Sequence, residues 1–163
     1  MASKKGLSIL TVMFALGVVG VALISSCRQS RSPQKVVINI PAKSTWVDTG
    51  VDVTNKTIQI KYESGTWSND GAESHFCDGE GFIPESQDFR DVIPKLLVQN
   101  APLGALVGRT NGEPFFVGNT YEDRPGEGHL YLSINDKPDS FDDNAGSLRI
   151  VVTVLDGTPI PAP

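Results

Sequence analysis

The side chains best suited to binding a ligand are concentrated in the segment 135–146, where carboxylates, amides and a hydroxyl follow one another closely. Its four carboxylates are those of Asp136, Asp139, Asp142 and Asp143. Carboxylates held together in one turn repel each other unless a cation lies between them. Ca²⁺ binds about six to eight oxygens, which carboxylates, amides and backbone carbonyls can supply. The segment therefore predicts a calcium site, with a solvated hairpin loop as the alternative because Asp, Asn, Gly and Pro are also the usual turn residues.

The N-terminus carries a second chemically distinctive pattern. Lys4 and Lys5 precede an uncharged stretch, 6–27, which ends Leu-Ile-Ser-Ser-Cys and then turns polar. This ending resembles the lipobox of bacterial lipoproteins, in which an aliphatic residue stands three positions before an invariant Cys. The resemblance implies a signal peptide over 1–26, and a lipidated Cys27 that begins a tether over 27–35. An uncleaved single-pass helix is the alternative.

Either interpretation of the N-terminus places the rest of the chain outside the cytoplasm. A single acyl chain holds a protein weakly, whereas a diacylglyceryl group on Cys27 would supply more than one chain. We therefore expect a bacterial cell-envelope protein, lipid-anchored to the outer membrane or to the outer face of the cytoplasmic membrane.

Charge and composition exclude several classes of protein. The chain has 163 residues and a formal net charge of −5, and such an acidic chain lacks the clustered Lys and Arg that nucleic acid requires. Its two Cys and two His are too few for a Cys/His zinc site. No GxSxG, HExxH, P-loop or GxGxxG motif is present. Although two carboxylates could hydrolyse a glycoside, no pattern positions such a pair, so we do not expect an enzyme.

Four other side chains allow both a structural and a functional interpretation. Cys77 has no disulfide partner once Cys27 is lipidated, and we expect an inert, buried thiol because acidic neighbours raise a thiol pKa. Trp46 and Trp67 could stack on sugar rings, but burial between strands is favoured. His75 could contact a ligand, but a solvated or locally hydrogen-bonded ring is favoured.

The elements that would position these residues are strands. From Lys35 onward the chain shows no helical periodicity, only short β-branched runs separated by turn residues. The runs are 36–40, 45–47 with 51–53, 57–62, 104–108, 114–118, 128–135 and 147–154. Seven or eight strands predict an all-β, single-domain antiparallel β-sandwich, of the jelly-roll or galactose-binding-like kind, over 36–155. A Pro-rich tail follows over 156–163, and 67–103 is expected to be a long excursion with one short helix or strand near 95–99.

Three stretches resemble the PA-IL-like galactophilic lectins, the LecA family of small calcium-dependent β-sandwiches. The first is Gly-Thr-Trp at 65–67, and the second is Gly-Ala-Leu-Val-Gly at 104–108, followed by Phe-Phe-Val-Gly at 115–118. The third is 128–147, which resembles the last strand pair of the family and the metal loop between its strands. The similarity spans roughly 36–154, and the metal loop is its most specific part.

The resemblance implies a Ca²⁺ site whose coordination two adjacent sugar hydroxyls would complete. Calcium polarises these weakly binding hydroxyls, and flanking carboxylates accept their protons. The implied metal ligands are the side chains of Asp136, Asp143 and Asn144 and the backbone carbonyls of Ser140 and Asp70. The predicted carbohydrate contacts are Asp136, Lys137 and Asp143.

The sequence also departs from the family pattern. The His and Gln with which the family contacts galactose fall on Asp91 and Pro94, and Asp143 replaces an amide. We therefore expect an exported, lipid-anchored, calcium-dependent carbohydrate-binding module whose glycan is not plain galactose. The alternative is a non-catalytic envelope lipoprotein with a structural calcium site and a protein-interaction role.

Overall fold

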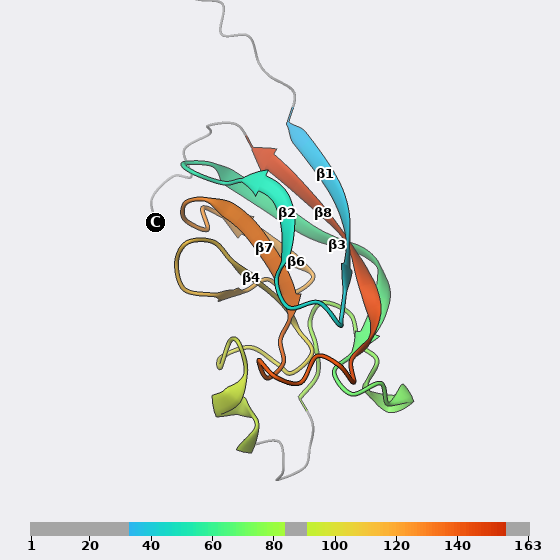
Figure 1. Cartoon of the computed structure of the whole chain (residues 1–163). Coiled ribbons are helices and arrows are strands. Elements are labelled where there is room, and N and C mark those ends of the chain that lie inside the picture. The colour runs from blue at the N-terminus through green and yellow to red at the C-terminus, as the bar shows by residue number, and fades with distance from the viewer. Residues whose placement is uncertain (1–32, 84–90, 156–163) are drawn as a thin grey trace, which may run out of the picture. The chain divides into compact units, whose positions relative to one another are not determined.

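The structure is a computed structural model, and it describes residues 33–83 and 91–155 (Figure 1). Two antiparallel four-stranded sheets form a β-sandwich, with the order β1-β8-β3-β6 in sheet A and β2-β7-β4-β5 in sheet B. The strands are β1 (Gln34–Pro41), β2 (Val47–Asp52), β3 (Thr57–Ser68), β4 (Leu106–Arg109), β5 (Phe115–Phe116), β6 (Thr120–Asp123), β7 (His129–Ile134) and β8 (Ala145–Leu155). This architecture confirms the prediction of an all-β antiparallel sandwich.

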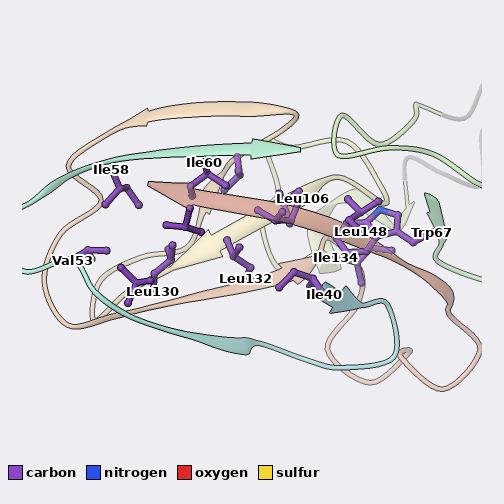
Figure 2. Close-up of a cluster of buried hydrophobic side chains, with 14 of the residues drawn as sticks. Ile40, Val53, Ile58, Ile60, Trp67, Leu106, Leu130, Leu132, Ile134 and Leu148 are labelled. Atoms are coloured by element: carbon purple, nitrogen blue, oxygen red, sulfur yellow. The ribbon is translucent and has the colours of Figure 1, made fainter. Parts of the chain in front are cut away.

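Apolar side chains from both sheets meet in one core (Figure 2). In β7 the alternate residues Leu130, Leu132 and Ile134 are fully buried, as the two-residue period of a strand predicts. Trp67 is also fully buried near the end of β3, where its Nε1 donates a hydrogen bond to the Gly104 carbonyl oxygen at 2.6 Å. Trp67 is therefore a core residue, and it ties the long excursion to the sandwich.

Several strand boundaries differ from those expected from the sequence. β3 continues to Ser68 because a register shift between Tyr62 and Ser64 breaks the alternation without ending the pairing with β8. β6 was not expected, because its residues are polar apart from the half-buried Tyr121 and it lies at the edge of sheet A. β1 begins at Gln34, inside the segment assigned to the tether, because it pairs with β8 from that residue onward.

The excursion between β3 and β4 contains little regular structure. Its described residues include two short 3₁₀ helices, η1 (Glu73–His75) and η3 (Ile93–Lys95), and two isolated bridges. One bridge joins Trp67 to Cys77 and the other joins Phe82 to Leu103. The first bridge ties the excursion to the end of β3, and the second joins its middle to the residues just before β4.

The predicted signal peptide over 1–26, its lipidation site Cys27 and the Pro-rich tail over 156–163 lie outside the described residues. In the two ranges that the structure describes, no helix has the length and apolar character needed to cross a membrane.

Candidate functional site

Three segments that are distant in the sequence meet at one end of the sandwich. Asp136 follows β7, and Asn144 immediately precedes β8. The end of β3 lies beside the start of β8, because Trp67 pairs with Gly146 and Ser68 with Ala145. The loop between β7 and β8 therefore lies against the residues that follow β3.

This end of the sandwich contains three buried oxygens without a hydrogen-bond donor among the described residues. They are Oδ2 of Asp136, Oδ1 of Asn144 and Oδ1 of Asn69, called here the orphan oxygens. The side chains of Asp136 and Asn144 are 1% and 0% exposed. A buried acceptor without a donor is costly, and in a native protein it usually indicates a bound water or ion.

Hydrogen bonds on the opposite side of each group fix which oxygen is left free. The backbone N–H of Lys137 donates to Oδ1 of Asp136 at 2.7 Å, so Oδ2 is the free carboxylate oxygen. Nδ2 of Asn144 donates to the Ala42 carbonyl oxygen at 3.1 Å, so Oδ1 points away from that contact. The arrangement is therefore preorganised, with both free oxygens held by rigid neighbours.

The electrostatics of Asp136 favour a cation beside it. Burial raises the pKa of its carboxyl, and the negative charge of Asp143 raises it further. The N–H of Lys137, the side chain of Asn144 and the charge of Lys137 oppose this shift of the pKa without cancelling it. Because the folded-state pKa is raised, the contribution of Asp136 to stability falls as pH rises through the interval between the unfolded and folded pKa values. A bound cation would remove this penalty.

The Asp70 side chain is fully engaged, so only its backbone carbonyl is available. Oδ1 accepts hydrogen bonds from Ser68 Oγ and from the Ala72 N–H, each at 2.9 Å. Oδ2 lies 2.7 Å from Nδ1 of His75, whose ring stacks on Phe82 with centroids 5.1 Å apart. Although burial would raise the pKa of Asp70, the contacts with Ala72, His75 and Ser68 lower it. Asp70 therefore remains a carboxylate, and its hydrogen bonds stabilise the turn that follows β3.

The other predicted site residues lie in the β7–β8 loop. Asp143 is exposed, whereas Lys137 and Ser140 are half-buried, and the Ser140 N–H donates to the Lys137 carbonyl oxygen at 3.1 Å. In the described ranges, no hydrogen bond reaches the carbonyl oxygen of Ser140 or of Asp70. All five predicted metal ligands thus belong to the segments that meet at this end, and two of them carry orphan oxygens.

Within residues 33–83 and 91–155, no group of three or more His, Cys, Asp or Glu side chains could hold a metal ion. A cation at this end would therefore depend on amide and backbone oxygens in addition to carboxylates. Such a set suits a hard cation such as Ca²⁺ better than a transition metal.

Asn135 positions the excursion over the site, a role that the sequence interpretation missed. It is completely buried, and its Oδ1 accepts a hydrogen bond from the Val98 N–H at 2.9 Å. Its Nδ2 donates to the carbonyl oxygens of Val98, Ala101 and Pro102 at 2.9–3.1 Å. The Leu97 N–H also donates to the Asp136 carbonyl oxygen at 3.0 Å. The segment 97–102 is therefore bound directly to the end of β7.

Comparison with known proteins gives the family relationship. No protein-family model matches the sequence, and no curated protein sequence matches it. Among solved structures, the chain is similar to the N-terminal domain of EclA, described as a PllA-like lectin, with a TM-score of 0.56 and 26% sequence identity. The similarity covers 74% of this chain and 96% of that domain. The chain is related to the PllA-like lectins. The relationship extends over a whole lectin domain, which confirms the resemblance to LecA-type lectins found in the sequence.

Other residues singled out in the sequence are accounted for within this PllA-like lectin fold. Burial, followed by the charge of Asp78, raises the pKa of Cys77 to about 12, so this thiol is not a nucleophile. Trp46 is half-buried, with the Arg109 guanidinium 4.7 Å from the centre of its ring. Asp91 and Pro94 are exposed, in the part of the excursion that precedes the segment 97–102.

Proposed function

We propose that this domain binds carbohydrate through a bound Ca²⁺ ion. The observation that carries the proposal is the pair of buried, unpartnered oxygens on Asp136 and Asn144. Burying a carboxylate and an amide oxygen without donors is unfavourable unless a ligand occupies the space beside them. The similarity to a PllA-like lectin supports a sugar as the molecule that binds with the ion.

The chain offers enough oxygens for such an ion. Side chains of Asp136, Asp143 and Asn144 and carbonyls of Ser140 and Asp70 would hold it, and sugar hydroxyls would complete the coordination. When bound, Ca²⁺ polarises these hydroxyls and strengthens their hydrogen bonds to nearby carboxylates. The exposed Asp143 can accept such a bond, and the half-buried Lys137 can donate one.

A glycan array tests the proposal on the full chain purified in detergent. We expect a subset of glycans to bind in Ca²⁺ and to be lost in EGTA. Terminal galactose alone should bind weakly, because Asp91 and Pro94 stand where the related lectins use His and Gln. Strong, chelator-sensitive binding to galactose resin would contradict this specificity. If the array stays empty although Ca²⁺ stabilises the chain, the alternative of structural calcium and protein interaction is favoured.

We also propose that the domain is attached to a bacterial membrane through lipid on Cys27. The sequence Leu-Ile-Ser-Ser-Cys at 23–27 supports this proposal. Cys27→Ala should prevent incorporation of labelled palmitate and leave an uncleaved precursor, because the modified thiol is the substrate for later processing. Cys77→Ala is the matched control and should label normally. Unchanged labelling of the Cys27 variant would refute the anchor.

A further inference from the structure

The third orphan oxygen belongs to Asn69, a residue that neither the family pattern nor the sequence interpretation assigns to the site. Its Oδ1 is buried and has no donor among the described residues, although the residue as a whole is only half-buried. Three such side-chain oxygens occur in the described part of the chain, and the other two belong to Asp136 and Asn144. The strand pairing shows where Asn69 lies relative to these two residues.

The pairing of β3 with β8 places Asn69 near Asn144. Trp67 lies opposite Gly146 and Ser68 opposite Ala145, where the pairing ends, so Asn69 and Asn144 are each one residue beyond the last pair at the same end of sheet A.

Packing around Gly71 confirms that the two segments are in contact. A Cβ atom added at Gly71 would lie 3.2 Å from the Asp143 carbonyl oxygen and 3.9 Å from Cβ of Ala145. The turn after β3 therefore lies directly against residues 143–145. The Asp70 carboxylate, held by Ser68, Ala72 and His75, fixes the conformation of this turn.

All three orphan oxygens therefore belong to segments that meet at one end of the sandwich. Asn69 and Asn144 each lie one residue beyond the last β3–β8 pair, and Asp136 and Asn144 stand at the two ends of the β7–β8 loop. We infer that Asn69 Oδ1 is an additional side-chain ligand of the cation. The inference rests on the proposed function, and it adds a neutral oxygen from the turn after β3 to ligands that otherwise come mainly from the β7–β8 loop.

The test compares calcium affinity with the stability of the calcium-free protein. Asn69→Leu in the full chain should weaken the calcium Kd, measured by titration calorimetry, by about tenfold or more, because the number and charge of oxygen ligands set affinity. Its melting temperature in EGTA should be unchanged or higher, because the substitution removes a buried acceptor without a donor. Asn69→Asp keeps an oxygen and should retain calcium binding, while melting lower in EGTA because it adds charge near Asp136.

Asn119→Leu is the matched control. Oδ1 of Asn119 accepts the Gly79 N–H at 2.9 Å and its Nδ2 donates to Asp78 at 3.0 Å, so its role is structural. This variant should melt at a lower temperature in EGTA and keep its calcium Kd. If the calcium Kd of Asn69→Leu stays within about twofold of that of the unsubstituted chain, the inference about Asn69 is overturned and the proposed function is not. If Asn69→Leu does not fold, loss of calcium binding in Asn69→Asp would overturn the inference. A chain that binds no calcium before substitution would overturn the proposed function as well.

Discussion

Asp136→Ala should abolish the stabilisation that Ca²⁺ gives to the folded chain. Binding to the folded state alone stabilises it by about 2.7 kcal/mol at a hundredfold excess of ligand over Kd. For a domain of this size, that free energy corresponds to a rise in melting temperature of about 5 °C or more. Asp136 carries the one fully buried carboxylate at the site, so its loss removes the central charged ligand. Thermal melts in Ca²⁺, Mg²⁺ and EGTA measure the effect.

The control for this experiment is Asp139→Ala. Asp139 is exposed in the same loop but lies outside the proposed ligand set, so its variant should keep most of the calcium response. Mg²⁺ should stabilise the unsubstituted chain less than Ca²⁺, because it requires near-octahedral geometry and gives up water reluctantly. Identical melts of the unsubstituted chain in all three solutions would remove the metal site and the main support for sugar binding.

Asn135→Ala should produce the largest loss of stability among single substitutions near the site. The substitution leaves one N–H and three carbonyl oxygens of the segment 98–102 without their partner. A buried polar group without a partner costs about 1–3 kcal/mol, so the free energy of unfolding should fall by about 3 kcal/mol or more. Urea denaturation measures this change, and hydrogen exchange of 97–102 should accelerate because these residues lose their attachment to β7.

Asn100→Ala is the control for Asn135→Ala. Asn100 is exposed in the same segment, and its substitution should change the free energy of unfolding by less than about 0.5 kcal/mol. The Asn135 variant should also bind calcium more weakly, because the segment that contacts the Asp136 carbonyl becomes loose. A loss of stability below about 1 kcal/mol would show that the segment is held in place by other contacts.

The strands that could be predicted from sequence are those with long, regular alternation. β7 and β8 carry alternating or continuous apolar residues because both lie inside their sheets, where the core dictates side-chain identity. β6 escaped prediction because an edge strand with one half-buried side chain, Tyr121, leaves no apolar pattern. The end of β3 escaped prediction because a register shift reversed the alternation after Tyr62.

The site could be predicted in part, through the type and spacing of residues in one loop. Asp136 and Asn144 were singled out because they flank a short oxygen-rich segment between two clear strands, and the structure buries both with an unpartnered oxygen. Asn69 and Asn135 were missed because their roles depend on which chain segment returns over the end of the sandwich. A single Asn has the same appearance in a sequence whether it binds an ion, holds a loop or faces water. The one available signal for Asn69 was its position two residues after Trp67, just beyond the end of β3.

The pairing of β1 with β8 determines how the domain would respond to mechanical load. β1 pairs with β8 along its whole length, from Gln34 opposite Val154 to Pro41 opposite Ser147. The next residue, Ala42, accepts the hydrogen bond from Asn144 at the candidate site. If the chain is held at Cys27 while a surface-bound ligand pulls on the site, the force runs along β1. The force then acts on all the hydrogen bonds between β1 and β8 at the same time, parallel to the strands, and does not break them one by one. With the proposed anchor at Cys27, β1 would therefore be oriented to resist tension.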